Sequence, residues 1–378
     1  MIQELQEELG EVRAKGLFRK LRTLSRIQGT HASWEGKEIV LFCGNDYLGL
    51  SQDERVKEAA REAIARYGVG AGAARLISGT SDLHTQLERE LARFKTTERA
   101  LIFGSGYLAN VGALTALAGE EDLIVMDKLC HASLIDGAKL SGARIRTFPH
   151  KNYRRSEEIL ATAQGYRRKL LVSDSLFSMD GDWAELEELV RLKDRHGAIL
   201  VVDDAHAIGI FGSRGQGLVD ERYRGRVDVT AGTLSKAFGV FGGFLAGSEE
   251  IVESLINFSR PFLFATSPPP ALMAACLTSL RLIEEEPFLR ERLWKNVDAV
   301  REFLRGKGRP SGYRSPILPI PVGDEKEAVR ISEELLEKGV LVPAIRYPTV
   351  PRGKARLRLT VSAAHTDEDL EKLFGAFP

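Results

Sequence analysis

Residues 198–209, AILVVDDAHAIG, pass from a run of apolar side chains to a group of polar ones. Such a run is typical of a strand that is buried on both faces and carries its polar residues at its carboxyl end. Similar runs occur at 122–127 (DLIVMD), 169–175 (KLLVSDS) and 227–233 (VDVTAGT), and they alternate with amphipathic helical patterns such as 82–94. This alternation predicts an α/β fold with a large, mainly parallel, doubly wound sheet.

The pattern changes near residues 265–276, ATSPPPALMAAC, where three prolines interrupt the chain. A long helical stretch follows, and the tail then has two strands, at 315–322 and 355–361, with a helix between them. We expect an N-terminal helix and lead-in segment with one short strand over 1–45, a large domain over 46–275, and a smaller C-terminal α/β domain over 276–378.

Composition excludes several classes of protein. The 53 basic residues balance the 53 acidic ones, so no overall charge favours nucleic acid. The N-terminus mixes acids and bases, unlike a signal or transit peptide, and no apolar run is long enough to span a membrane. The three cysteines are widely separated, as in a protein of a reducing compartment, so we expect a cytoplasmic protein with reduced thiols.

A glycine-containing loop precedes a predicted helix at Gly104-x-Gly106-x-x-Ala109, and Asp127 ends the next strand. This outline resembles a dinucleotide-binding fingerprint, which makes an NAD-dependent oxidoreductase one alternative. The motif is short and lies far from the first strand. Such a loop can bind phosphates other than those of a dinucleotide, because a helix N-terminus presents free amides to any phosphate.

Reactive side chains follow the ends of four predicted strands. They are His131, Ser178, Asp203, His206, Thr233 and Lys236. Because ligands of open parallel sheets gather beyond the carboxyl ends of the strands, we expect these side chains to form one site. Pyridoxal phosphate (PLP) needs a lysine for covalent attachment, an acid beside its ring nitrogen and a cradle for its phosphate. Lys236, Asp203 and the loop at 104–109 can meet these three needs.

The stretch VVDDAHAIGIFG (201–212), followed by TLSKAFG (233–239), resembles the α-oxoamine synthases, which are PLP enzymes of fold type I, the aspartate aminotransferase-like fold. GNDYLGLS (44–51), FGSGYLAN (103–110) and DSLFSMDGD (174–182) support the resemblance, which covers nearly the whole chain. It implies an acyltransferase that condenses an amino acid with an acyl thioester and releases CO2, acting as a homodimer.

The resemblance also implies roles for individual residues. Lys236 would hold the cofactor and move protons, Asp203 would face the ring nitrogen, and His131 would stack on the ring. His206 and Ser178 would bind the phenolic oxygen. The phosphate would be bound by Gly106, Tyr107 and Thr233, with Thr266, or alternatively Ser267, reaching the phosphate of a neighbouring subunit.

The segment AIRYPTVPRGKARLR (344–358) is most similar to the member of the family that joins L-alanine to a pimeloyl thioester, carried by CoA or acyl carrier protein, in biotin synthesis. In this comparison Arg346 would bind a carboxylate. Thr349, Asn45, His131 and Arg19 would border the substrate, with Arg22 as an alternative to Arg19. A glycine and acetyl-CoA enzyme, a dual-specificity enzyme and a PLP aminotransferase remain alternatives.

Overall fold

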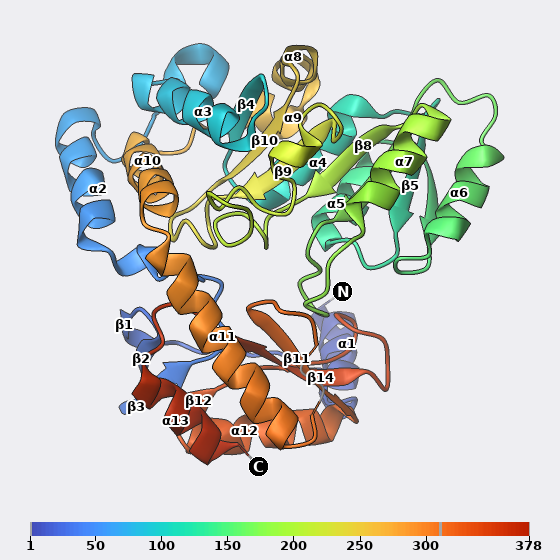
Figure 1. Cartoon of the computed structure of the whole chain (residues 1–378). Helices are drawn as coiled ribbons and strands as arrows, with labels where there is room; N and C mark the ends of the chain where they lie inside the picture. Colours follow the sequence, from blue (N-terminus) through green and yellow to red (C-terminus); the bar gives the residue numbers. More distant parts are fainter. Residues whose placement is uncertain (1, 310–311, 378) are drawn as a thin grey trace. The chain divides into compact units, whose positions relative to one another are not determined.

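The computed structural model describes residues 2–309 and 312–377 in two units (Figure 1). The large unit comprises Asp46–Ser178 and Asp182–Glu291. The small unit comprises the residues up to Asn45, the short segment Met179–Gly181, and the residues from Arg292 onward. The N-terminal lead-in thus folds together with the C-terminal part of the chain.

The large unit is built on a seven-stranded sheet with the strand order β4-β10-β9-β8-β7-β5-β6. Its strands are β4 (Arg99–Phe103), β5 (Leu123–Asp127), β6 (Arg144–Phe148), β7 (Lys169–Asp174), β8 (Ile199–Asp203), β9 (Val229–Thr233) and β10 (Gly243–Gly247). The pairs from β9 to β6 are parallel, whereas β10 is antiparallel to both of its neighbours. β5, β7, β8 and β9 match the four predicted runs, and the parallel pairs confirm the mainly parallel sheet.

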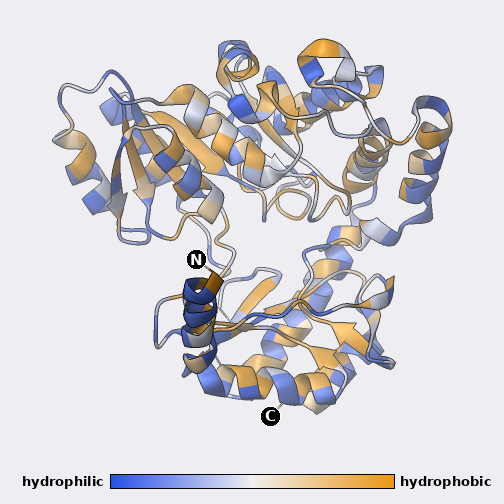
Figure 2. Cartoon of the chain, turned by 180° about the vertical axis from the view of Figure 1, so that it is seen from behind, coloured by the Kyte–Doolittle hydropathy of each residue, from blue (hydrophilic) through white to orange (hydrophobic). Residues whose placement is uncertain are grey.

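Helices surround this sheet. They are α2 (Glu54–Tyr67), α3 (Asp82–Lys95), α4 (Gly106–Leu117), α5 (Ala132–Leu140), α6 (Tyr153–Ala161), α7 (Leu186–His196), α8 (Glu249–Phe258), α9 (Arg260–Leu263) and α10 (Pro270–Glu285). Successive residues of β5 belong to two different apolar clusters: Ile124 packs with residues of α4 and α5, and Val125 packs with residues of α7. The sheet is therefore covered on both faces, which explains its nearly continuous apolar strands, coloured as hydrophobic in Figure 2.

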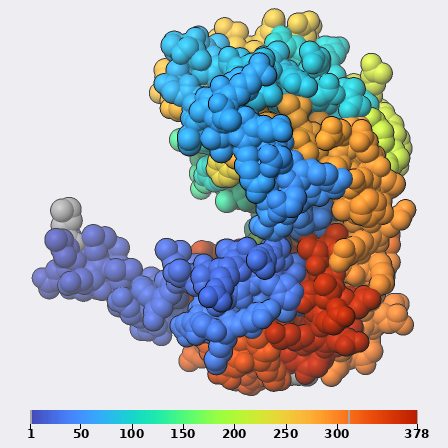
Figure 3. Space-filling model, turned by 90° about the vertical axis from the view of Figure 1, so that its left-hand side faces the viewer, coloured from blue at the N-terminus to red at the C-terminus, as the bar shows by residue number. Residues whose placement is uncertain are grey.

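The small unit contains two sheets. One has the order β1-β2-β3-β12, and the other has the order β11-β14-β13. The strands are β1 (Ser25–Gln28), β2 (His31–Trp34), β3 (Lys37–Leu41), β11 (Ile317–Gly323), β12 (Val340–Leu341), β13 (Ala344–Ile345) and β14 (Ala355–Thr360). The helices are α1 (Ile2–Ala14), α12 (Glu325–Glu337), α13 (Asp367–Ala376) and α11 (Phe288–Gly306), which begins in the large unit. Figure 3 shows α1 projecting from the rest of this unit, and none of its residues is buried.

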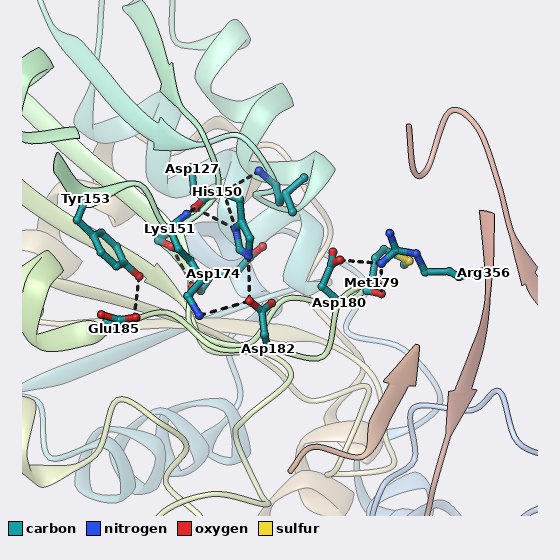
Figure 4. A network of polar contacts seen from close by, with 12 residues as sticks. Asp127, His150, Lys151, Tyr153, Asp174, Met179, Asp180, Asp182, Glu185 and Arg356 are labelled. Atoms are coloured by element: carbon teal, nitrogen blue, oxygen red, sulfur yellow. Dashed lines mark hydrogen bonds and ion pairs between the residues drawn. The ribbon is translucent and has the colours of Figure 1, made fainter. Parts of the chain in front are cut away.

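Contacts around Arg356 explain why Met179–Gly181 belongs to the small unit. The guanidinium of Arg356, on β14, donates to Asp180 Oδ1 at 2.6 Å and to the carbonyl of Met179 at 3.1 Å (Figure 4). Gly181 lies so close to β11 that an added Cβ would be 2.2 Å from the carbonyl oxygen of Ile317. A side chain at this position would push the segment away.

Three features differ from the expectations. The hairpin β1–β2 was not predicted, because its first strand is exposed along its whole length and has no apolar signal. The long helical stretch is broken between α10 and α11, where Pro287 cannot continue a helix interior. The lead-in reaches the C-terminal part of the chain through the parallel pair β3–β12. Within residues 2–309 and 312–377, every helix is too short or too polar to cross a bilayer.

Candidate active site

One pocket of the large unit collects side chains from the carboxyl ends of β7, β8 and β9 and from the starts of α4 and α5. It is lined by Gly106, Tyr107, Asn110, His131, Asp174, Leu176, Ser178, Asp203, Ala205, His206, Thr233 and Lys236. Eight of the nine residues predicted to bind the cofactor are in this set, and Thr266 is the exception. The structure therefore brings together side chains that are up to 130 positions apart, from Gly106 to Lys236.

Lys236 follows β9 on a tight turn, in which the amide of Gly239 donates to the carbonyl of Lys236 at 2.8 Å. Gly239 has a φ of +69°, and a Cβ there would lie 2.3 Å from the backbone nitrogen of Ser51. Only glycine fits this close approach without strain. The small residues after the lysine thus hold the chain against Ser51 and keep Lys236 at the pocket.

Asp203 ends β8, and its carboxylate is held by two donors. The side-chain amide of Asn110 donates to Oδ2 at 2.6 Å, and the backbone amide of Ala205 donates to Oδ1 at 2.9 Å. Asn110 also donates to the Ser133 hydroxyl at 2.9 Å, which fixes the orientation of its amide. A fixed carboxylate in a pocket is suited to stabilise a protonated ring nitrogen.

His131 caps the start of α5. Its Nδ1 is 2.7 Å from the Ser133 hydroxyl, and its backbone amide donates to Asp174 Oδ2 at 2.9 Å. Desolvation lowers the pKa of His131, and the nearby Lys236 acts in the same direction against the opposing effect of Asp203. A neutral, fixed imidazole can stack on a flat ring.

His206 is oriented by a buried partner. Its Nδ1 lies 2.8 Å from the hydroxyl of Tyr47, and both side chains are buried. The contact holds the imidazole ring in place beside Ser178, which lines the same pocket. This pair is suited to hydrogen-bond an oxygen on a bound ring.

The start of α4 provides a cradle for an anion. Ser105 caps the helix, and its hydroxyl accepts from the amide of Leu108 at 3.1 Å. The first amides of a helix have no intrahelical partner, and the helix dipole favours negative charge there. An added Cβ on Gly243 would lie 2.4 Å from the nitrogen of Gly106, so glycine is needed where β10 meets this helix end. Thr233 adds a hydroxyl beside Gly106.

The pocket therefore has an amine, a fixed carboxylate and an anion cradle, which are the groups that PLP requires. The residues present fit this cofactor. Among the described residues, no group of histidine, cysteine and acidic side chains could hold a metal ion instead. Asp127, the acid of the dinucleotide-like motif, is bonded to His150 and to backbone amides.

Four lining residues were not predicted from the sequence, and two of them, Asn110 and Asp174, are polar. Asn110 is a buried amide in a helix of mostly apolar and small residues, and this contrast was a usable signal. Asp174 ends β7 as Asp203 ends β8, and the two are register partners. Burial, and then the charge of Asp203, raise the pKa of Asp174 well above its ordinary value.

Four of the five residues predicted to bind substrate, Arg19, Asn45, Arg346 and Thr349, belong to the small unit, whereas His131 lies in the pocket of the large unit. Arg346 donates to the backbone carbonyls of Gly16 and Phe18, and the amide of Thr349 donates to the carbonyl of Arg346 at 3.0 Å. Arg19 is exposed.

Asn45 accepts a hydrogen bond at 3.3 Å from Arg358, a buried arginine that the sequence analysis did not single out. Thr266, in the large unit, is exposed and pairs with Ala74 through an isolated β-bridge. The roles of Asn45 and Thr266, like those of the other candidate residues, stay predictions.

Comparison with known proteins places this site in a family. The sequence model of class I and II aminotransferases matches residues 37–377. The chain is 45% identical to the 8-amino-7-oxononanoate synthase of Symbiobacterium thermophilum, over 99% of this chain and 96% of that protein. It is 46% identical to the 8-amino-7-oxononanoate synthase of Geobacter sulfurreducens, over 100% of this chain and 97% of that protein.

Solved structures agree. Serine palmitoyltransferase of Sphingomonas wittichii superposes with a TM-score of 0.93 at 33% identity, covering 99% of this chain and 95% of that one. A variant of serine palmitoyltransferase from S. paucimobilis with bound PLP has the same TM-score at 31% identity, covering 99% and 96%. These likenesses confirm the predicted fold type I and the predicted cofactor, PLP. The chain belongs to the class I and II aminotransferase family and, within it, to the α-oxoamine synthases.

Proposed function

We propose that this chain condenses L-alanine with a pimeloyl thioester to give 8-amino-7-oxononanoate, CO2 and the free thiol carrier, in biotin synthesis. One observation carries the proposal. Lys236, Asp203 and His131 meet in one pocket of a chain that is 45% identical, along almost its whole length, to an 8-amino-7-oxononanoate synthase. We also propose that it acts in the cytoplasm, as its widely separated cysteines lead us to expect.

Bound PLP supplies an electron-withdrawing ring that stabilises negative charge on the α-carbon of the amino acid. The amine of Lys236 would hold the cofactor and carry the proton of that α-carbon. Asp203, kept in place by Asn110, would stabilise positive charge at the ring nitrogen. His131 would cover one face of the ring, and its fixed Nδ1 contact limits its rotation.

The remaining lining residues would orient the cofactor. The amides of Gly106 and Tyr107, at the start of α4, and the hydroxyl of Thr233 would bind the phosphate. His206 and Ser178 would hydrogen-bond the phenolic oxygen. These contacts would fix both ends of a flat molecule, which leaves its reacting carbon beside Lys236.

For the substrate we propose Arg346, because a guanidinium has five donors and only two are used by the carbonyls of Gly16 and Phe18. The others can pair with a carboxylate. Asn45, Thr349 and Arg19 complete the proposed substrate residues.

We propose that the active form is a homodimer. Ile77 and Phe264 are 80% and 72% exposed, and the β-bridge between Ala74 and Thr266 places their segments side by side. Large apolar side chains that gather on a surface usually mark an interface. Thr266 lies in this patch and would reach the partner's phosphate. Analytical ultracentrifugation should therefore give twice the mass of 41.7 kDa.

A product assay tests the reaction. The purified protein is given alanine or glycine with pimeloyl-CoA, pimeloyl-acyl carrier protein or acetyl-CoA, and products are identified by mass spectrometry. We expect 8-amino-7-oxononanoate from alanine and a pimeloyl thioester. A product only from glycine and acetyl-CoA would reject the proposal in favour of that alternative. A PLP aminotransferase would instead release pyruvate without consuming thioester.

A spectroscopic control tests the cofactor assignment. The protein should have a visible absorbance band that borohydride abolishes. Lys236→Ala should lose turnover and lose borohydride fixation of the cofactor while keeping its circular dichroism in the far ultraviolet. Asp203→Asn should bind the cofactor but react very slowly. Retained turnover in either variant would contradict the role of that residue.

A further inference from the structure

A histidine that packs on Phe177, between the lining residues Leu176 and Ser178, bridges two carboxylates. His150 follows β6, and its Nδ1 lies 3.1 Å from Asp127 Oδ1 while its Nε2 lies 3.0 Å from Asp182 Oδ2 (Figure 4). The edge of the imidazole meets the ring of Phe177, with centroids 4.4 Å apart and planes at 83°. Both ring nitrogens can donate only when the imidazole carries its second proton. The geometry is therefore that of an imidazolium between two carboxylates.

The Asp127 side of the bridge orders the turn that leads to His131. The carboxylate of Asp127 accepts from the backbone amide of Leu129 at 2.8 Å and from that of Lys151 at 2.8 Å. His131 follows Leu129 by two residues, and its amide is bonded to Asp174. A shift of Asp127 would therefore move the residue that is proposed to cover the cofactor ring.

The Asp182 side of the bridge closes the loop that carries Ser178. The amide of Phe177 donates to the backbone carbonyl of Asp182 at 2.9 Å, and Leu176 forms a β-bridge with Trp183. Leu176 and Ser178 both line the pocket. The position of Asp182 therefore sets the position of a second pocket wall.

We propose that His150 is a positioning residue for the reaction, which as a cation holds Asp127 and Asp182 at a fixed spacing. Through these two carboxylates it sets the separation between His131 and Ser178. This inference rests on the proposed function, since it assumes that both residues contact the cofactor. His150 itself is not among the residues that line the pocket.

The electrostatics support a cationic His150. Burial by itself would lower its pKa, but the hydrogen bonds that its ring donates to Asp127 and Asp182 raise the pKa to about 9. Other ionisable groups near this bridge include Lys151, Tyr153, Asp174, Cys130 and Glu185. Lys151 Nζ lies 3.4 Å from Asp182 Oδ2. Because the pKa is raised above the ordinary 6.5, the bridge is intact below that value and is lost as the pH rises through about 9.

His150→Gln removes the bridge, because a neutral amide carries both of its N–H donors on one nitrogen and cannot replace the two ring nitrogens that contact the two carboxylates. The small unit offers a matched control. The Nδ1 of His31 lies 3.2 Å from Glu38 and its Nε2 lies 2.9 Å from Asp369, so that His31→Gln breaks the same kind of bridge among residues that do not line the pocket. Both variants are studied as the holoenzyme, beside the native protein.

The primary readouts are the dissociation constant of PLP, by equilibrium dialysis, and the visible circular dichroism of the bound cofactor. We expect His150→Gln to weaken PLP binding roughly tenfold, which corresponds to the loss of about one charge-assisted hydrogen bond. The visible circular dichroism should also change, while the KM for alanine should change less than kcat. Between pH 7 and 10, PLP affinity should fall more in the native protein and in His31→Gln than in His150→Gln.

The proposal would be overturned if His150→Gln had the same PLP dissociation constant, visible circular dichroism and pH profile as the native protein. The bridge would then be a purely structural feature. If His150→Gln does not fold, the variant Asp182→Asn tests the proposal instead, because it keeps the shape of the side chain and removes one charge. It should change the spectrum in the same direction, and an unchanged spectrum would overturn the proposal. Failure of the proposed function is distinguishable, since the native protein would then bind no borohydride-sensitive PLP.

Discussion

Replacement of Lys95 by methionine should destabilise the large unit by about 3–5 kcal/mol. Lys95 is the last residue of α3, and its side chain and that of Asp204 are both completely buried, with 0% exposure. The ammonium donates to Asp204 Oδ2 at 2.9 Å, to the carbonyl of Val219 at 2.7 Å and to the carbonyl of Gln216. Methionine has nearly the same length, so the substitution removes charge and hydrogen bonds but little packing.

The magnitude follows from what remains around Asp204. Its carboxylate would keep the Ser175 hydroxyl at 2.6 Å and the amide of Leu218 at 3.2 Å, but no cation. Removing one partner of a buried ion pair typically costs about 3–5 kcal/mol, because an uncompensated charge is left in the interior. Burial already raises the pKa of Asp204, and Lys95 is the largest effect opposing it. In the variant this pKa rises further, and Asp204 would become neutral at low pH.

The pH dependence has a definite sign. A carboxyl group whose pKa is raised on folding contributes stability below its ordinary value, and that stability is lost as the pH rises through the folded pKa. The penalty in Lys95→Met should therefore be smallest near pH 5 and largest near pH 8. Urea unfolding, followed by circular dichroism at one saturating PLP concentration, measures it.

The double variant Lys95→Met with Asp204→Asn is the control. It removes the stranded charge, so it should be more stable than Lys95→Met alone at pH 8. A loss below about 1 kcal/mol in the single variant, or a double variant that is less stable than the single one, would refute the reasoning. The first outcome would mean that water or another cation reaches Asp204.

Three further changes have expected outcomes. Gly243→Ala should weaken PLP binding at least tenfold in equilibrium dialysis, because the new Cβ would lie 2.4 Å from Gly106 N and displace the phosphate cradle. Asn110→Ala should lower kcat/KM, with a loss of about 1.5–3 kcal/mol of transition-state stabilisation, because Asp203 loses a charge-assisted hydrogen bond. An unchanged kcat/KM would show that the reaction does not depend on the orientation of Asp203 by Asn110. Burial raises the pKa of Cys43 to about 11, so its alkylation, followed by peptide mass spectrometry, should be slow at pH 8 and accelerate up to about pH 11.

The sequence was most informative where strands are buried on both faces. β5, β7, β8 and β9 were predicted from their apolar runs, and the polar residues after them met in one pocket because parallel strands end at the same edge. The direction of β10 was not predictable, since residues 243–247 have the same small and apolar pattern in either direction. β12 has only two residues, and it pairs with β3 about 300 positions earlier, a contact that no local pattern encodes.

The same limit applies to the site. Asp203, His206 and Lys236 were identified because strand ends and glycine-rich turns mark them locally. Asn110 was not, because its role depends on Asp203, 93 positions away. His150 was missed for a related reason. Its two carboxylate partners lie 23 and 32 positions away, at the end of β5 and in the loop after β7, so no local pattern links them to it.

Three carboxylates at adjacent strand ends would repel one another if all were charged and none were compensated. Asp174 and Asp203 are register partners on β7 and β8, and Asp204 follows directly. Asp204 is compensated by the buried ammonium of Lys95. Asp174 is buried, and burial and the charge of Asp203 raise its pKa, which disfavours a second negative charge beside Asp203. The arrangement therefore leaves Asp203, held by the amide of Asn110, as the carboxylate that presents its charge to the pocket. That is the distribution of charge which a protonated pyridine ring needs.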